Sequence, residues 1–385
     1  MQKNPAPSAE TYLPLFQLIA IFLGNTHKPS FLTIDDKFFT RCNKLGLAPL
    51  LSYLVDSNDL SDDSLVTSLN SIKLTSKFST ENISTALNQI LDILADDFEQ
   101  VVLLKGVGLY QNYYPEPFIR IMGDIDILIY NANDIQNVVK KLAASGFYQM
   151  SHNPSSFYET HHHLKPFYSK ELDVWFELHT RLLPDKSAFG KLHAIQPDFL
   201  KTQLIAKSFA GKNVYILQPE INLLYIIIHW VSEFRISGNL IQFVDCCLIL
   251  DKHAPEFDWP KFLSFIEQRN AATCVKLVLA LITKNEICLL PKEHLRNLRK
   301  KKDSAGFIGM LILNYIVNGI VNNKFIVTRL IGVSNCEHIW QAYMRNNRPL
   351  VNLFLAAKFV LSPPNSKTEK AGIIARVIRL FQRIR

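Results

Sequence analysis

The segment that most constrains the fold is DIDILIY, at residues 124–130. Its polar and apolar residues alternate, which predicts a β-strand with Asp124 and Asp126 on one face and isoleucines on the other. Two carboxylates on one face of an apolar strand repel each other and resist burial. A divalent cation between them removes that penalty, and carboxylate oxygens suit Mg²⁺, with Mn²⁺ as the alternative. We therefore expect Asp124 and Asp126 to be metal ligands rather than solvated acids.

A second short strand is predicted upstream, in VVLLK at residues 101–105, and it leads into the turn Gly106-Val107-Gly108. A glycine turn between a strand and a helix lets backbone N–H groups approach a phosphate, and the helix N-terminus favours negative charge. Lys105 and Arg120 supply nearby cations. We expect Lys105, Gly106, Gly108 and Arg120 to bind a nucleotide. A plain tight turn, and salt bridges from the two cations to the same acids, are the structural alternatives.

A third carboxylate is expected from the segment ELDVWFELHTRL, at residues 171–182. As a strand, this segment places Asp173, Trp175, Glu177 and His179 on one face. Glu177 is the best candidate for the third acid, and Asp173 is the reserve candidate. His179 is expected to orient a neighbouring side chain rather than to bind metal.

Several short motifs between residues 104 and 179 form one pattern: Leu104-Lys105-Gly106, Tyr114-Pro115-Glu116-Pro117, Arg120, Gly123-Asp124-Ile125-Asp126 and Glu177-Leu178-His179. This pattern resembles an uncharacterised bacterial nucleotidyltransferase family of the DNA polymerase-beta-like nucleotidyltransferase superfamily. It also looks like the nucleotidyltransferase-type toxins of abortive-infection and toxin–antitoxin systems. The motifs together are fairly specific, although any one of them alone would be weak.

The resemblance implies an α+β fold, in which a small mixed-sheet nucleotidyltransferase core is flanked by N-terminal and C-terminal helical regions. It also implies an Mg²⁺-dependent enzyme that transfers a nucleoside monophosphate, for example from ATP, to an acceptor hydroxyl and releases pyrophosphate. Asp124, Asp126 and Glu177 would be the catalytic and metal-binding residues. The acceptor is left open between a small molecule, a protein and RNA.

The hydrophobic spacing divides the chain into three parts: a helical region at residues 1–98, the core at 99–184, and a helical domain at 185–385 that ends in a basic amphipathic tail. Within the core we expect strands at residues 100–104, 124–130, 161–168 and 171–180, and helices at 107–113 and 133–145. The tail, AGIIARVIRLFQRIR, has the pattern of an amphipathic helix, which could pack on the body of the protein, contact anionic lipid or bind a nucleic-acid backbone.

Composition adds few constraints. The chain has 385 residues and a formal net charge of +8, which permits contact with phosphate-rich partners. Six scattered cysteines without a CxxC pair favour a reducing cytoplasm. His161, His162 and His163 suggest a zinc cluster, but without cysteine partners the sequence does not favour a structural zinc. Residues 305–323 carry no charge, and we expect a buried helix there rather than a membrane span.

Two other functions remain compatible with the sequence. One is a non-catalytic protein that binds a nucleotide and works by contacting partners; the intact Asp124, Asp126 and Glu177 argue against it. The other is a toxin-like transferase that acts on RNA ends, which the positive charge would allow.

Overall fold

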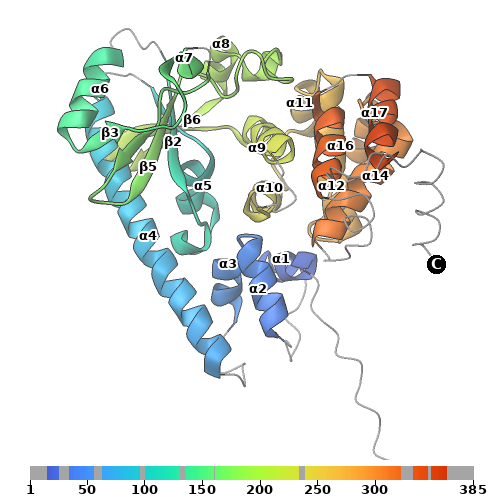
Figure 1. Cartoon of the computed structure of the whole chain (residues 1–385), viewed down its shortest axis with the longest axis horizontal. Coiled ribbons are helices and arrows are strands. Elements are labelled where there is room, and N and C mark those ends of the chain that lie inside the picture. The colour runs from blue at the N-terminus through green and yellow to red at the C-terminus, as the bar shows by residue number, and fades with distance from the viewer. Residues whose placement is uncertain are drawn as a thin grey trace, which may run out of the picture.

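A seven-stranded mixed sheet with the strand order β3-β4-β5-β2-β1-β7-β6 forms the centre of the fold (Figure 1). Its strands are β1 (Val101–Leu103), β2 (Asp124–Ile129), β3 (Phe147–Gln149), β4 (Phe167–Ser169), β5 (Val174–His179), β6 (Leu204–Phe209) and β7 (Lys212–Leu217). β2 runs parallel to β5 and antiparallel to β1, and β1 runs parallel to β7. The computed structural model describes residues 15–25, 34–55, 63–95, 100–130, 135–159, 161–233, 239–321, 333–345 and 348–361.

Helices surround this sheet on both sides. The N-terminal part contains α1 (Leu15–Phe22), α2 (Asp36–Lys44), α3 (Ala48–Leu54) and α4 (Asp63–Ala95). The sheet region contributes α5 (Lys105–Tyr113), α6 (Ile135–Ala144), α7 (Ser155–Tyr158) and α8 (Pro197–Leu200). The C-terminal part contains α9 (Pro219–Glu233), α10 (Ile241–Lys252), α11 (Trp259–Ser264), α12 (Arg269–Lys284), α13 (Lys292–Lys300), α14 (Gly306–Val321), α16 (Val333–Arg345) and α17 (Pro349–Leu361). The expected α+β class, with helical regions on both sides of the sheet, is confirmed.

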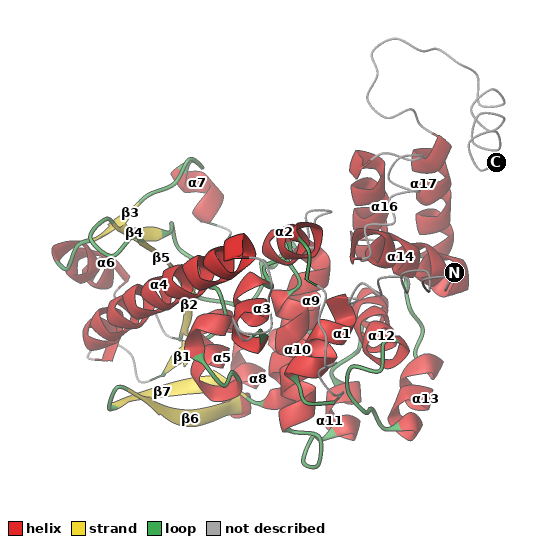
Figure 2. Cartoon of the chain, turned by 90° about the horizontal axis from the view of Figure 1, so that it is seen from below, coloured by secondary structure: helices red, strands yellow, loops and turns green. Residues whose placement is uncertain are grey.

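The two faces of the sheet have different partners. One face carries Ile125, Ile127, Phe176 and Leu178, and it packs against the long helix α4 and against α6 (Figures 1 and 2). The other face is covered by α5 near β1 and β2, and Val102 and Leu128 belong there to a larger apolar cluster that includes α9 and α10. The alternation of apolar residues in β2 and β5 accounts for this division, because successive side chains of a strand point to opposite faces.

Most of the predicted core elements are present, but the strand expected at residues 161–168 is wrong. In that segment His163 forms only an isolated bridge with His179, and the regular strand β4 begins at Phe167. Pro166 lies between them. Proline has no N–H to donate to a ladder, so continuous pairing through this position is disfavoured.

The helical domain expected at residues 185–385 also contains a hairpin, formed by β6 and β7, which was not expected from the sequence. Ala210 and Gly211 at its turn both have positive φ, +49° and +81°, which is the pattern of a two-residue turn that matches strand twist. β7 then pairs with β1 through Val102 and Tyr215, so the sheet continues past residue 184. The sequence signal was a short alternating run, KNVYIL, directly after a glycine.

The membrane and tail expectations have different outcomes. Within the part of the chain that the structure describes, none of the helices has the length and apolar character needed to cross a bilayer. Most of the uncharged stretch at residues 305–323 forms α14, which buries Leu313 and Val317 against other helices. The basic tail lies outside the described residues.

The first prediction concerns Gly108, in α5. A Cβ atom at this position would lie 2.6 Å from the backbone oxygen of Leu103, which cannot move without shifting β1. We expect Gly108→Ala to lower the free energy of unfolding by about 1–3 kcal/mol, although alanine normally favours a helix over glycine. Urea denaturation followed by circular dichroism measures the difference.

Gly123→Ala is the matched control, because an added Cβ at Gly123 meets no heavy atom within 4 Å. Its unfolding free energy should stay within about 0.5 kcal/mol of that of the unsubstituted protein. Equal stability of the two variants would contradict the close approach of α5 to β1.

Candidate active site

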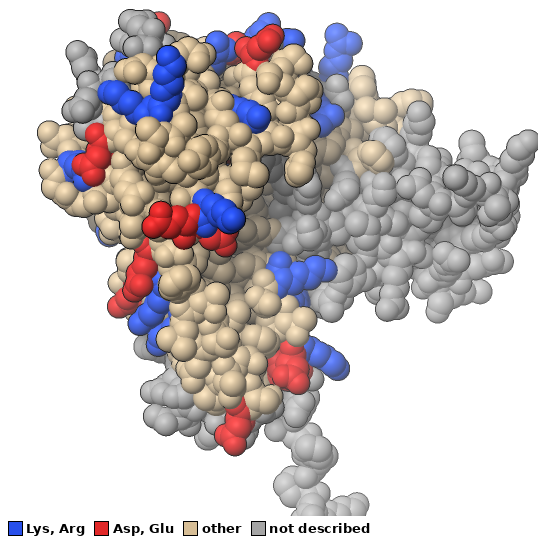
Figure 3. All heavy atoms as spheres, turned by 60° about the vertical axis from the view of Figure 1, so that its left-hand side comes forward, with Lys and Arg blue, Asp and Glu red and all other residues tan. Residues whose placement is uncertain are grey.

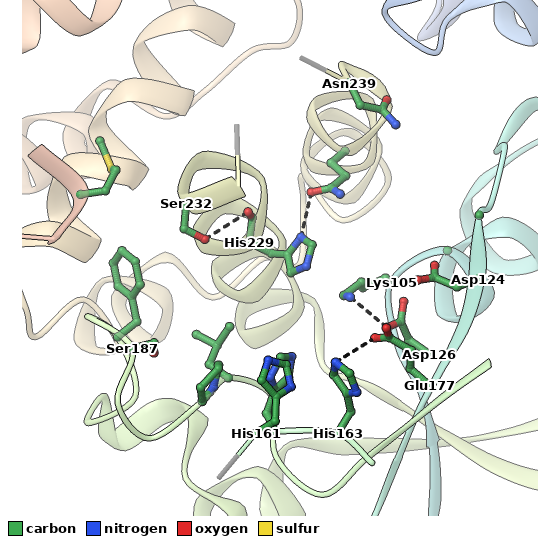
Figure 4. A pocket seen from close by; sticks show the side chains of 18 of the residues that line it. Lys105, Asp124, Asp126, His161, His163, Glu177, Ser187, His229, Ser232 and Asn239 are labelled. Carbon is green, nitrogen blue, oxygen red and sulfur yellow. Dashed lines mark hydrogen bonds and ion pairs between the residues drawn. The ribbon is translucent and has the colours of Figure 1, made fainter. Parts of the chain in front are cut away.

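The predicted acids meet on the face of the sheet that lies opposite to α4. Asp126 of β2 lies directly opposite Glu177 of β5 in the register, and Asp124 precedes them on the same face (Figure 4). Asp126 is buried, whereas Asp124 and Glu177 are partly exposed to the cavity described below. Asp173 does not join them: it is exposed in the turn before β5 and accepts a hydrogen bond from the Tyr168 hydroxyl, 2.8 Å away. Of the two candidates for the third acid, the structure brings Glu177 to the pair.

Two further side chains hold the Asp126 carboxylate. Lys105 Nζ and His179 Nε2 each lie 2.8 Å from Asp126 Oδ1. Lys105 has a φ of +44°, an unfavourable conformation for a residue with a Cβ, which typically costs about 1–2 kcal/mol. His179 Nε2 is also 3.5 Å from Glu177 Oε2. His179 therefore contacts both carboxylates, and its hydrogen bond orients that of Asp126.

The electrostatics of the three acids differ. Burial raises the pKa of Asp126, but Lys105 and His179 outweigh that effect and hold the pKa well below its usual range. The negative charge of Asp126, reinforced by burial, raises the pKa of Asp124 to about 7. Burial also opposes ionisation of Glu177, but the hydrogen bond from His179 lowers its pKa. Asp124 is thus the acid whose charge the surrounding protein does not balance.

This imbalance fits a divalent cation. Asp126, Glu177 and His179 each offer one ligand atom, and these atoms lie within 4.8 Å of one another. In the described part of the chain, no hydrogen-bond donor or ion-pair partner to the Asp124 carboxylate is present. Asp124 lies outside this group, but a cation held beside Asp126 would reduce the repulsion that raises the pKa of Asp124. The donor set is rich in hard oxygens, which suits Mg²⁺ or Mn²⁺.

The glycine turn expected before the helix is wrong, because Gly106 and Gly108 lie inside α5, where both have a packing role. A Cβ on Gly106 would lie 2.6 Å from Met122 Cγ, and one on Gly108 would lie as close to the Leu103 backbone. They let the start of α5 pack closely against β1 and the loop before β2. Leu104, the residue that caps α5, supplies no side-chain hydrogen bond. The helix N-terminus beside Lys105 is therefore not capped by that side chain, which keeps the expected phosphate contact open.

Arg120 has a different partner from the one expected. Its Nε and Nη2 atoms donate to the Asp245 carboxylate of α10 at 2.8–3.0 Å, and the pair is almost fully buried. The Tyr114 hydroxyl donates to the same carboxylate at 2.6 Å. This bond network joins the loop before β2 to α10. It occupies the guanidinium edge that would otherwise receive a phosphate.

The acids open into a cavity of about 890 Å³. Its walls come from the sheet, from the segment at residues 183–189, and from α9, α10 and α16. Several lining residues were not singled out as site residues from the sequence: Lys186, Ser187, Gln242 and Arg345. Each lies outside the core motifs, and nothing in the local sequence marks them. His229 of α9 also lines the cavity, and burial together with nearby Lys105 lowers its pKa to about 3.

The second prediction separates a structural Arg120 from a phosphate-binding one. Removing one member of a buried ion pair leaves the other charge unpaired, so Arg120→Ala should lower the free energy of unfolding by about 3–5 kcal/mol. Chemical denaturation measures this change in the free energy of unfolding. Arg181→Ala, in an exposed pair with Asp185, is the matched control and should change stability little. A stable Arg120→Ala variant with weakened triphosphate binding would instead assign Arg120 to the phosphates.

Comparison with known proteins identifies the family. The family model described as "Uncharacterised nucleotidyltransferase" matches residues 34–285, which include the whole sheet and every acid discussed above. No curated protein and no solved structure matches the chain. The matched region is well over half of the 385 residues, and the chain therefore belongs to this family of uncharacterised nucleotidyltransferases.

Proposed function

We propose that the protein is a nucleotidyltransferase that transfers a nucleoside monophosphate from a nucleoside triphosphate to an acceptor hydroxyl. The observation that carries this proposal is the convergence of Asp124, Asp126 and Glu177 at the wall of a cavity large enough for a nucleotide. These three carboxylates would hold Mg²⁺, with Mn²⁺ as the alternative. When bound, the ion would neutralise charge on the phosphates as the leaving group departs.

The side chains around the acids have separate tasks in this proposal. His179 fixes the orientation of the Asp126 carboxylate, and Lys105 supplies a permanent positive charge beside it. Lys105 and the N-terminus of α5, with Gly106 and Gly108, would contact the triphosphate. Lys186 and Arg345, both exposed at the cavity, replace Arg120 as the further cations.

The reaction balances without an additional reactant. The acceptor oxygen forms a bond to the α-phosphorus, the bond from that phosphorus to the bridging oxygen breaks, and pyrophosphate leaves. Glu177 faces the cavity and is partly exposed, and it would either complete the metal ligands or take the proton of the acceptor hydroxyl. The rest of the catalysis is positioning and charge neutralisation.

The face of the sheet that carries the acids also carries a row of aromatic residues. Tyr148, Tyr168 and Trp175 lie opposite one another across β3, β4 and β5, and Trp175 in turn lies opposite Asp124. The rings of Tyr168 and Trp175 are 4.8 Å apart, and Tyr148 and Trp175 are 59% and 39% exposed. Exposed aromatics on adjacent strands stack the bases of single-stranded RNA. This observation favours an RNA end as the acceptor.

The charge distribution is consistent with stacking as the main contact. On the face shown in Figure 3, Lys and Arg side chains lie among Asp and Glu side chains and do not form one basic patch. Buried cysteines that form no disulfide include Cys42, Cys246, Cys247, Cys274 and Cys288, and we propose the cytoplasm as the compartment on that basis.

The third prediction tests the transfer itself. The protein is incubated with each nucleoside triphosphate, labelled at the α-phosphate, with Mg²⁺ or Mn²⁺ and a panel of RNA, protein and small hydroxyl acceptors. Asp126→Asn and Glu177→Gln should lower label transfer by about 10²-fold or more, since each removes a charge that the transition state needs. Asp173→Asn, which changes an exposed acid in the turn before β5 and outside the cavity, should retain transfer.

Two outcomes would contradict this assignment. Equal labelling by the unsubstituted protein and by both carboxylate variants would remove the acids from catalysis. Stabilisation by one nucleotide and metal, without label transfer to any acceptor, would favour the non-catalytic nucleotide-binding protein.

The fourth prediction concerns the aromatic row. Trp175→Ala should reduce labelling of single-stranded RNA by roughly tenfold, because one stacked base is worth about 1–3 kcal/mol. Phe78→Ala, which removes a 65% exposed aromatic ring from α4, is the control and should label RNA normally. If Trp175→Ala labels RNA as well as the unsubstituted protein does, the row is not the acceptor platform.

A further inference from the structure

Three consecutive histidines gather at a different part of the same cavity wall. The ring centroids of His161, His162 and His163 are 4.2–4.8 Å apart in all three pairs. One ring nitrogen from each residue lies within 4.8 Å of one from each of the others. In a regular strand the middle ring would point to the opposite face, so the bent backbone of this segment is what brings the three rings together. All three residues line the cavity (Figure 4 labels His161 and His163).

This cluster contains polar atoms that lack partners. The Nδ1 atoms of His161 and His162 are buried, and neither has a hydrogen-bond partner in the described residues. An unsatisfied buried polar atom typically costs about 1–3 kcal/mol. The proposed nucleotidyl transfer uses neither residue, so it does not account for this cost.

His163 adds an independent observation. Its Nδ1 lies 2.6 Å from the Leu164 backbone oxygen, to which only an N–H can donate. In the neutral ring the proton is therefore on Nδ1, and Nε2 presents a lone pair. That lone pair lies 3.6 Å from Glu177 Oε2, so two acceptors face each other across a short gap. A cation between or beside them would turn this repulsion into attraction. An Nδ1–H bonded to a backbone carbonyl is also the usual support of a metal-binding histidine.

We propose that His161, His162 and His163 bind a divalent transition-metal ion, with Zn²⁺ as the expected one, at a position that borders Glu177 of the carboxylate site but does not use Asp124 or Asp126. Imidazole nitrogens favour Zn²⁺ over Mg²⁺, whereas the three acids have the opposite preference. Three histidine ligands without cysteine also form a known type of zinc site, which keeps a further position for water or substrate. The lack of cysteine partners, which argued against zinc in the sequence, therefore does not exclude this site.

The protonation of the cluster supports metal binding. Burial lowers the pKa of His161 to about 4, and it also lowers the pKa values of His162 and His163. All three rings are then neutral at neutral pH, which is the form that binds a metal ion. His163 places the cluster beside Glu177, so an ion here would border the proposed transfer site without using Asp124 or Asp126.

The fifth prediction is tested with the full chain, freed of metal by a chelator and kept in excess Mg²⁺ to saturate the carboxylate site. Titration calorimetry with Zn²⁺ should give one site per chain. The double variant His161→Ala/His162→Ala should weaken binding at least tenfold. Two controls should bind Zn²⁺ normally: His152→Ala, which removes an exposed histidine of the same segment, and Asp124→Asn/Asp126→Asn, which disables the carboxylate site.

Co²⁺ in place of Zn²⁺ reports the type of ligand without any mutation. A Co²⁺ ion with nitrogen ligands in a low-coordinate site absorbs visible light strongly, whereas one in an octahedral site of oxygen ligands absorbs it weakly. His161→Gln/His162→Gln is a second variant, which keeps side-chain volume and polarity if the alanine variant fails to fold. Circular dichroism checks the fold of each.

Three results would overturn the proposal: no Zn²⁺ binding by the folded protein, binding that survives both histidine double variants, or binding that is lost in the carboxylate variant. None of them bears on label transfer with Mg²⁺, so this proposal and the proposed function fail or stand separately.

Discussion

The pairing of the buried Asp126 carboxylate with Lys105 and His179 is the interaction on which the rest of the site depends. A charge held in the interior must be paired, and here Lys105 and His179 pair it from two different elements. Lys105 reaches it only by adopting a left-handed backbone conformation, and His179 only because β5 runs parallel beside β2. The strand order of the sheet and the start of α5 are therefore set so that one carboxylate stays ionised. Because Asp126 stays ionised, its negative charge, together with burial, raises the pKa of Asp124 to about 7.

The sequence predicted the central part of this arrangement because strand alternation is a local property. The patterns DIDILIY and VWFELH fix which side chains share a face, and the apolar faces of β2 and β5 pack against α4 and α6 as that alternation requires. Glu177 could be preferred to Asp173 from the sequence. The decision, however, comes from the register, which pairs Asp126 with Glu177 and leaves Asp173 in the turn.

The features that the sequence did not predict all depend on long-range contacts. Arg120 meets Asp245, a residue of α10 that is 125 positions away, and no local pattern links the two. The hairpin of β6 and β7 joins the sheet through β1, which precedes it by about a hundred residues. The histidine cluster depends on a backbone bend that alternation does not foresee, since alternation would put His162 on the opposite face from His161 and His163. Lys186 and Arg345 are ordinary surface cations until the tertiary fold brings them to one cavity.

The bond network of Arg120, Tyr114 and Asp245 has a consequence for the shape of the cavity. It joins the loop before β2 to α10, a helix of the opposite cavity wall, through a bidentate ion pair that is almost fully buried. Because this network joins the two walls, the distance between them is fixed before a ligand binds. A ligand that fits such a preformed cavity loses little binding free energy to ordering the protein.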